Sequence, residues 1–177
     1  MASQPELRIA DLNIDRTELL DLNVAYVRWV LDGVEARFGL TPVEVVGSEP
    51  HVYAEANLHK VAGDLPPRGV FYLAHLGDAA VAMGGLRTIR AGIGEIKRIY
   101  VRPNARGQGL ARLVLDRLID DARTFGMSEV YLETAPFMTD AHRLYETSGF
   151  VDRTPYAEAE VPVALHDDWR FMALRLD

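Results

Sequence analysis

The chain has 177 residues, no cysteine and a formal net charge of −7 at pH 7. The lack of cysteine excludes disulfides, zinc–thiolate sites and a cysteine nucleophile, and the acidic balance argues against a nucleic-acid-binding surface. No apolar run approaches the roughly 20 residues of a membrane span, and the N-terminus lacks the basic-then-apolar pattern of a signal peptide. We therefore expect a soluble, cytoplasmic protein with no membrane partner, folded as a single domain over residues 1–177.

The first third of the chain has a mainly helical pattern. A weak alternation of polar and apolar residues predicts an edge strand at residues 6–12. Asp15 is placed to cap a long helix. The apolar positions of that helix step by four and three residues: Leu20, Val24, Val27, Leu31, Val34 and Phe38. Proline and glycine predict a loop at residues 39–50, and residues 52–61 suit a shorter second helix.

The middle of the chain predicts an antiparallel meander. Residues 70–76 and 79–89 read as strands joined by a Gly77-Asp78 turn, which is a strong hairpin signal. Gly84-Gly85, inside the second of these strands, predicts a bulge or a close backbone approach. After a turn at residues 92–94, a central strand is expected at residues 95–101.

The rest of the chain predicts a crossover helix and the completion of the sheet. Apolar residues at helical spacing follow Gly109, and Gly126 closes that helix. The later elements are a strand at residues 129–134 parallel to the central strand, a helix between Thr139 as N-cap and Gly149 as stop, and a last strand at residues 169–176.

The segment Arg106-Gly107-Gln108-Gly109 joins the central strand to the crossover helix. Its glycines let an anion approach free backbone N–H groups, and the positive end of the helix dipole together with Arg106 favours negative charge. The segment has neither the Gly-Lys-Ser/Thr of a P-loop nor the third glycine of a dinucleotide fingerprint. It suits a pyrophosphate, although a tight turn that needs small residues before a helix is the alternative.

Two motifs in this order resemble the GNAT superfamily of acyl-CoA-dependent acyltransferases. The first is Arg106-x-x-Gly109-x-Ala111, after a strand that ends at residues 100–103, and the second is Ala-x-x-Leu-Tyr-x-x-x-Gly-Phe at residues 141–150. The resemblance implies a single-domain α/β fold with a mixed, mostly antiparallel sheet flanked by helices. It also implies a splay between the two central strands, which the thioester arm of acyl-CoA fills.

The same resemblance implies that acetyl-CoA is the acyl donor and that no metal takes part. Backbone N–H groups near Ile99 would face the thioester oxygen, and Val101 would bond the pantetheine arm. The residues implied to bind the donor are Ile99, Tyr100, Val101, Arg106, Gly107, Gln108, Gly109, Leu110, Ala111 and Arg112. Met138 departs from the family, which commonly has an asparagine there that binds the cofactor arm. Either Thr139 replaces that contact or the affinity is lower.

Acyl transfer to an amine requires a base for the amine and an acid for the departing thiolate. An amine with a pKa near 10.4 is the free base only about once in two thousand molecules at pH 7. The resemblance implies Tyr145 as general acid, because a phenol stays protonated at neutral pH, and Glu95 as candidate base, acting directly or through water. Glu133 is the reserve candidate. The alternatives are a core aromatic for Tyr145 and a salt-bridged strand residue for Glu95.

The acceptor is the part of the reaction that the sequence specifies least. Four basic residues crowd the two central antiparallel strands: Arg87, Arg90, Lys97 and Arg98. They either bind a carboxylate or phosphate of the acceptor or pair with local acids on a solvated face. Tyr26 and Trp29 either pack against a neighbouring element or form a wall of the acceptor pocket, as the resemblance implies for this region.

We expect the acetyl group to pass to a primary amine of a small molecule by direct attack. The alternatives are a protein N-terminal or lysine acetyltransferase, and a non-catalytic acyl-CoA-binding sensor. Dimers are common among the proteins that the chain resembles, so a homodimer is also an expectation.

Overall fold

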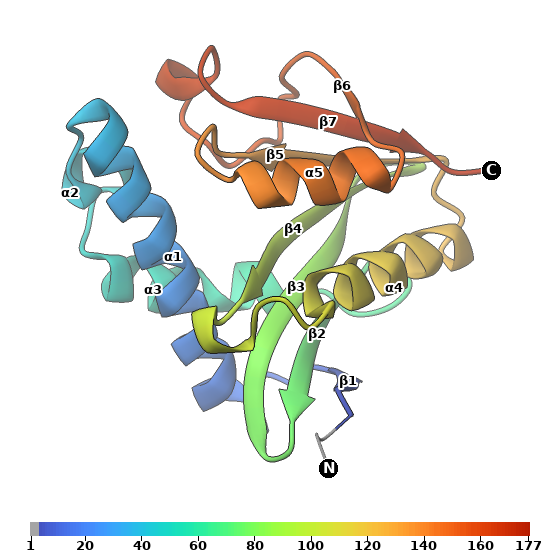
Figure 1. The fold of residues 1–177 in the computed structure, drawn as a ribbon. Helices are drawn as coiled ribbons and strands as arrows, with labels where there is room; N and C mark the ends of the chain where they lie inside the picture. The colour runs from blue at the N-terminus through green and yellow to red at the C-terminus, as the bar shows by residue number, and fades with distance from the viewer. Residues whose placement is uncertain (1–3) are drawn as a thin grey trace.

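The computed structural model describes residues 4–177, which form an open sheet with helices on both faces (Figure 1). In chain order the elements are β1 (Glu6–Ile9), α1 (Arg16–Phe38), α2 (Pro42–Val46), α3 (Pro50–Ala62), β2 (Gly69–Leu76), β3 (Ala79–Arg90), β4 (Ile93–Val101), η1 (Pro103–Ala105), α4 (Leu110–Thr124), β5 (Glu129–Thr134), α5 (Thr139–Thr147), β6 (Val151–Asp152), η2 (Val163–Leu165) and β7 (Arg170–Arg175). The strand order is β1-β2-β3-β4-β5-β7-β6, and only β4 and β5 pair in parallel. The predicted mixed, mostly antiparallel α/β sheet is confirmed.

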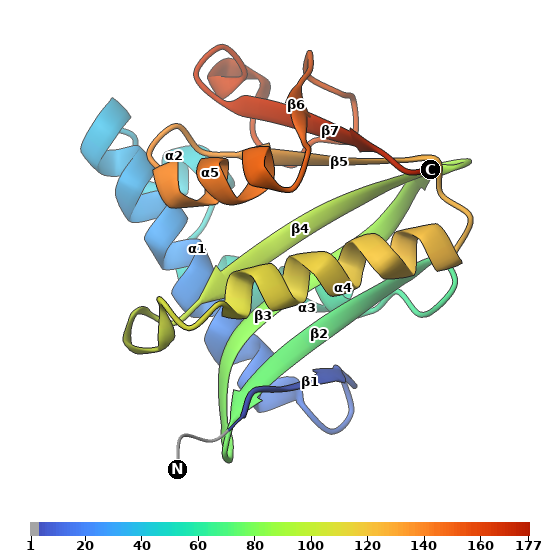
Figure 2. The ribbon, with the colours of Figure 1, turned by 45° about the vertical axis from the view of Figure 1, so that its right-hand side comes forward.

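The strand β2 is buried on both faces because helices cover both sides of the sheet. Val70, Tyr72 and Ala74 belong to the core cluster that includes α4. Phe71 and Leu73 belong to the cluster that includes α1 and α3. This division follows from the alternation of side chains along a strand. Figure 2 shows α4 in front of the central strands and α1 and α3 behind them.

The strands β4 and β5 pair only at their beginnings. The parallel pairs are Ile93–Glu129, Gly94–Val130 and Glu95–Tyr131. Beyond them, β4 continues along β3 and β5 continues along β7. The two strands therefore diverge into a V, which Figures 1 and 2 show from two sides. The predicted splay is confirmed.

A bulge lies in β4 near the point where the strands diverge. The register between β3 and β4 shifts opposite Gly84, so that Arg98 and Ile99 share one partner position. Arg98 has φ 59, a left-handed conformation that costs a non-glycine residue free energy. A Cβ at Gly84 would lie 2.5 Å from Cγ1 of Val114, so α4 packs closely on this glycine. The predicted irregularity at Gly84-Gly85 is confirmed, with the extra residue in β4.

Besides the short 3-10 helices η1 and η2, two elements were not predicted. The helix α2 lies within residues 39–50, where we expected a loop. Thr41 and Glu44 form a capping box, in which the Thr41 N–H donates to the Glu44 carboxylate at 2.8 Å. The Thr-x-x-Glu spacing is the sequence signal for such a helix start. The strand β6 has only two residues, too few to show a periodic pattern.

The ends of three elements also differ from expectation. Met138, not Thr139, is the N-cap of α5. Asp15 does occupy the N-cap of α1, but its carboxylate accepts hydrogen bonds from Arg8 at 2.7 Å and from the Asp11 N–H at 2.8 Å instead of from the helix. The strand β4 begins at Ile93, because the turn before it is shorter than predicted. Within residues 4–177, no helix combines the length and apolarity that a bilayer crossing requires.

Candidate functional site

A groove with a volume of about 500 Å³ follows the opening between β4 and α5 and reaches the start of α4. We call it the β4–α4 groove. Nine of the ten predicted donor-binding residues line it: Ile99, Tyr100, Val101, Arg106, Gly107, Gly109, Leu110, Ala111 and Arg112. The tenth, Gln108, does not. The second motif also contributes, through Ala141, Leu144 and Tyr145 of α5.

The start of α4 presents unused backbone donors to this groove. The N–H groups of residues 107–112 have no acceptor among residues 4–177, and Leu113 is the first to donate, to the Gly109 carbonyl at 3.0 Å. Gly107 and Gly109 both have φ 77, and a Cβ at either would meet nothing within 4 Å. Glycine is therefore needed here for backbone conformation, not for space. Such a run of N–H groups at a helix start suits a phosphate group.

Two arginines place positive charge beside these donors. Arg106 donates from Nε to the Val101 carbonyl at 3.1 Å, and its guanidinium lies 5.3 Å from the centre of the Trp29 ring. Arg112 donates to the Ser148 hydroxyl at 3.0 Å, which joins α4 to the end of α5. The two side chains thus stabilise the walls of the groove and also make its electrostatic potential more positive.

The open edge of β4 supplies further donors. The Arg102 N–H donates to the Val81 carbonyl of β3 at 2.8 Å. Successive N–H groups of a regular strand point to opposite sides, so that of Val101 points away from β3, into the splay. An extended ligand arm placed there would find the hydrogen-bonding groups of a missing strand.

Tyr145 reaches the groove from α5. It is 7% exposed, and its ring packs on Phe150 with the ring centres 5.9 Å apart. Burial raises the pKa of Tyr145 well above its ordinary value, so the phenol stays protonated at neutral pH. No group within residues 4–177 forms a hydrogen bond with its hydroxyl, which is therefore free to donate to a ligand.

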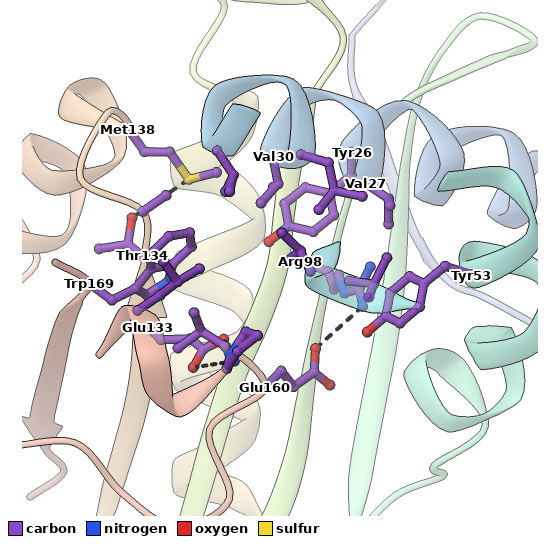
Figure 3. Close-up of a pocket in the computed structure, with 18 residues that line it drawn as sticks. Tyr26, Val27, Val30, Tyr53, Arg98, Glu133, Thr134, Met138, Glu160 and Trp169 are labelled. Atoms are coloured by element: carbon purple, nitrogen blue, oxygen red, sulfur yellow. Dashed lines mark hydrogen bonds and ion pairs between the residues drawn. The ribbon is translucent and has the colours of Figure 1, made fainter. Parts of the chain in front are cut away.

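A second cavity of about 100 Å³ lies beside the groove, and Figure 3 shows its lining residues. We call it the α1 cavity, because α1 forms one wall. Met138 lines both the cavity and the groove, and so stands where they adjoin. Seven residues bring polar side chains to the cavity: Tyr26, Tyr53, Arg98, Glu133, Thr134, Glu160 and Trp169.

Glu133, the reserve candidate base, is one of these polar residues. The Val161 N–H donates to its two carboxylate oxygens at 3.0 Å and 3.3 Å. Burial, reinforced by the nearby charge of Glu95, outweighs that hydrogen bond and raises the pKa of Glu133 to about 8. A carboxylate with this pKa can accept and release a proton near neutral pH.

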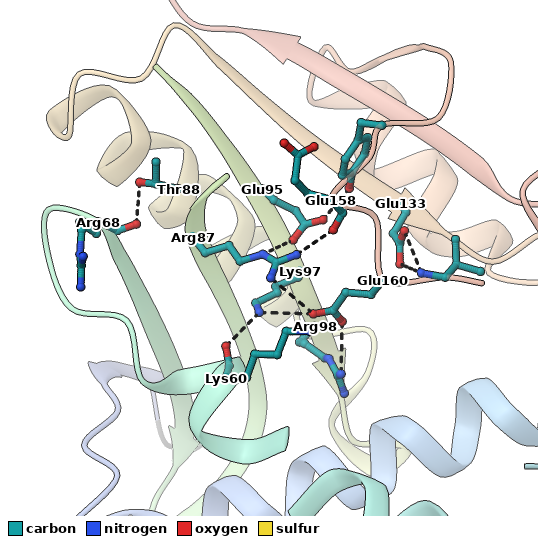
Figure 4. A network of polar contacts seen from close by, with 12 residues as sticks. Lys60, Arg68, Arg87, Thr88, Glu95, Lys97, Arg98, Glu133, Glu158 and Glu160 are labelled. Atoms are coloured by element: carbon teal, nitrogen blue, oxygen red, sulfur yellow. Dashed lines mark hydrogen bonds and ion pairs between the residues drawn. The ribbon is translucent and has the colours of Figure 1, made fainter. Parts of the chain in front are cut away.

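Glu95, the first candidate base, has different surroundings (Figure 4). It is 1% exposed and lines neither the groove nor the α1 cavity. Its carboxylate accepts hydrogen bonds from Arg87 at 2.6 Å and from the Tyr156 hydroxyl at 2.7 Å. Burial raises the pKa of Glu95, whereas these two partners lower it. A catalytic role for Glu95 stays a prediction, but these contacts favour Glu133 as the group that meets a ligand.

The four basic residues on β3 and β4 pair with acids. Glu160 accepts from Arg98 at 3.3 Å and lies 3.6 Å from the Lys97 Nζ (Figure 4). Arg90 pairs with Glu158 at 3.0 Å. Pairing with local acids was one of the two predicted alternatives, although the predicted solvated face is found only at Arg90, whose side chain is 49% exposed. The side chains of Lys97 and Arg98 are only 7% and 6% exposed, because the segment that carries Glu158 and Glu160 covers them.

The packing alternative for the aromatic residues of α1 is confirmed, and a role in an acceptor pocket stays a prediction. Tyr26 and Trp29 pack on Tyr100 of β4, with ring centres 6.2 Å and 5.9 Å away. Tyr26 also lines the α1 cavity, and Trp29 lines the β4–α4 groove. These two side chains therefore support the strand and form part of both walls.

Comparisons with known proteins agree with this geometry. Residues 39–150 match the model of the acetyltransferase (GNAT) family. An IAA acetyltransferase from Azospirillum brasilense is 37% identical over 87 residues, which are 49% of this chain and 57% of that protein. The chain thus spans little more than half of that relative.

Solved structures share the fold over nearly the whole chain. A GNAT-family acetyltransferase from Staphylococcus aureus Mu50 superposes with a TM-score of 0.73 at 16% identity, covering 98% of this chain and 100% of that one. The PaiA N-acetyltransferase from Thermoplasma acidophilum, solved in complex with coenzyme A, has a TM-score of 0.69 at 14% identity, covering 98% and 99%.

Proposed function

The chain belongs to the acetyltransferase (GNAT) family, and from this premise we propose that it transfers the acetyl group of acetyl-CoA to the primary amine of a small molecule. One observation carries the proposal. A groove with unused backbone donors adjoins, at Met138, a cavity that holds a carboxylate with a pKa of about 8. The groove suits an anionic donor with an extended arm, and the cavity suits an amine that must lose a proton.

The groove has the hydrogen-bond donors and the positive charge that suit acetyl-CoA. The free N–H groups of residues 107–112 would hold the pyrophosphate, with Arg106 and Arg112 adding positive charge. The inward N–H of Val101 would bond the pantetheine arm, and the N–H of Ile99, in the bulge of β4, would bond the thioester oxygen. When bound, acetyl-CoA supplies an acyl group that is already activated as a thioester.

The protein's own groups would move the protons. Glu133 takes a proton from the ammonium form of the acceptor, so that the amine nitrogen can form a bond to the acyl carbon as the carbon–sulfur bond breaks. The Ile99 N–H stabilises the negative charge that develops on the oxygen. Tyr145 donates its proton to the departing sulfur, and the second proton that the nitrogen loses after attack returns to Tyr145 through solvent. Glu95 would raise the pKa of Glu133 through its charge. Alternatively, Glu95 would itself be the base and act through water.

Steady-state assays can test this proposal against its alternatives. Release of CoA thiol would be followed with acetyl-CoA and a panel of amines, amino acids, polyamines and lysine peptides, with calorimetric CoA binding on the same sample. We expect binding and a release rate that depends on a small amine. Binding without release for any acceptor would favour a sensor, release only with peptides would favour a protein acetyltransferase, and no binding would overturn the proposal.

A further inference from the structure

One part of the wall of the α1 cavity is aliphatic, apart from the polar side chains described above. Its apolar members are mostly aliphatic and come from α1, α2 and the segment before β7: Val27, Val30, Leu31, Val34, Val45, Val46, Val161 and Leu165. Several of them are nearly inaccessible, such as Val34 at 1% and Leu31 at 3%. Contact with hydrocarbon on a surface of this kind is favourable, whereas an unpaired polar group that lies against it is unfavourable.

The volume of the cavity limits the hydrocarbon that it can hold. Its size is about 100 Å³. An apolar cavity of about 150 Å³ in another protein holds benzene, which has six carbons. The α1 cavity therefore suits a body of about four or five carbons, which is smaller than a sugar ring with substituents or a long polyamine.

Of the two acids that line the cavity, one is already paired with cations and the other can still pair with a cationic group of a ligand. Glu160 is already neutralised by Arg98 at 3.3 Å and Lys97 at 3.6 Å, and a third cation, Arg87, lies 3.9 Å away. Glu133 is the remaining acid of the lining, and a single backbone N–H of Val161 is its partner. A second ammonium on the ligand would face either the aliphatic wall or the buried guanidinium of Arg98. A carboxylate at the far end would meet either the same aliphatic wall or the guanidinium of Arg98, which Glu160 already pairs.

We propose that the α1 cavity selects primary monoamines whose remainder is an uncharged hydrocarbon of about four or five carbons. Glu133 receives the amino group, and the valines and leucines of α1 and α2 receive the hydrocarbon. This selectivity rests on the proposed function, since it names the acceptor of that reaction.

A set of matched ligands tests the selectivity directly. Methylamine, butylamine, 1,4-diaminobutane and 4-aminobutanoate would be compared as acceptors of acetyl-CoA by kcat/KM. We expect about a fourfold gain for each added methylene, or roughly fiftyfold from methylamine to butylamine. The diamine and the amino acid should be at least about tenfold worse than butylamine, because their second charge is left unpaired. If either charged compound equals or exceeds butylamine, the proposal is overturned.

Two variants of α2 test whether the cavity itself binds the hydrocarbon part of the amine. Val46→Phe fills the cavity and should lower the ratio of kcat/KM for butylamine to kcat/KM for methylamine by about tenfold. Val43→Phe is the matched control, because Val43 lies on the same helix, is 53% exposed and does not line the cavity. Equal effects of the two variants, or an unchanged ratio of butylamine to methylamine in Val46→Phe, would contradict the proposal.

Binding separates this inference from the proposed reaction. Butylamine and 1,4-diaminobutane would be titrated calorimetrically into the protein saturated with CoA. Preferential binding of butylamine without thiol release for any amine would uphold the selectivity and overturn the enzyme. Thiol release with the diamine but not with butylamine would uphold the enzyme and overturn the selectivity. Neither binding of butylamine nor release with it would overturn the selectivity, whatever other acceptors do.

Discussion

The β4–α4 groove and the α1 cavity adjoin at Met138 but are built in different ways. Ten of the eighteen residues that line the groove come from one stretch, residues 99–112, which offers free backbone N–H groups, and α5 forms the opposite wall. The cavity consists of side chains from segments between Tyr26 and Trp169 that are far apart in the sequence. A site made of backbone groups depends on conformation, and a site made of side chains depends on which segments meet. The groove should therefore tolerate most side-chain changes, whereas the cavity should not.

The largest effect is expected from Glu133→Gln, which removes the candidate base. We expect kcat to fall by about a thousandfold at pH 8, because the amine then loses the group that accepts its proton. In the wild-type protein kcat should rise with pH with its midpoint near pH 8 and level off above it, since Glu133 acts only when ionised and its pKa is about 8. The variant should lack this rise. A pH profile of kcat measures both, and an unchanged profile would remove Glu133 from the mechanism.

Glu95→Gln is the matched control for that variant. Because the charge of Glu95 raises the pKa of Glu133, removing it should move the rise in kcat to lower pH without abolishing activity. It should also destabilise the fold by about 3 kcal/mol, since Arg87 loses its buried partner. A loss of kcat as large as that of Glu133→Gln, in protein shown to be folded, would instead identify Glu95 as the base.

Tyr145→Phe should have the next largest effect. We expect kcat to fall by about a hundredfold, less than for Glu133, because a thiolate with a pKa near 8.5 leaves more readily than an ammonium loses its proton. The affinity for CoA should change less than about twofold, since the ring remains. Tyr100→Phe, which removes a hydroxyl from another tyrosine of the groove, should retain kcat. Equal activities of Tyr145→Phe and wild type would exclude it as the acid.

A smaller effect is expected from Gly109→Ala. The alanine would strain a backbone at φ 77 and turn the N–H groups away from the ligand, so CoA affinity should fall by about tenfold. Gly126→Ala is the matched control, because it has φ 75 with no neighbour near a Cβ and lies at the other end of α4. Both variants should lose similar stability. Calorimetry that finds equal CoA affinities in the two would contradict the assignment of the groove.

The smallest effect is expected from Val101→Ala. The N–H of Val101 and not its side chain points into the splay, so the affinity for CoA should change by less than about twofold. A loss of affinity larger than that of Gly109→Ala would show that side-chain packing, not backbone bonding, dominates the groove. The contrast with Val46→Phe in the α1 cavity would then disappear.

Much of the fold and of the groove could be predicted from the sequence because the signals are local. Glycines at 107 and 109 show a backbone conformation that few other residues adopt, and the hairpin at Gly77-Asp78 pairs neighbours along the chain. The helix α2 was missed although Thr41 and Glu44 have the spacing of a capping box. The strand β6 could not be seen, since two residues carry no period.

By itself, the sequence predicted the elements of the α/β fold through periodicity, and its two motifs carried the family resemblance that implied the splay and Tyr145 as the candidate acid. Only the tertiary structure decided that Glu133 lies in a cavity while Glu95 is enclosed by Arg87 and Tyr156. The two carboxylates differ in burial and in partners that come from residues 156–161, some sixty residues beyond Glu95 along the chain. Because a pKa depends on desolvation and on nearby charge, no pattern within either strand could assign their roles.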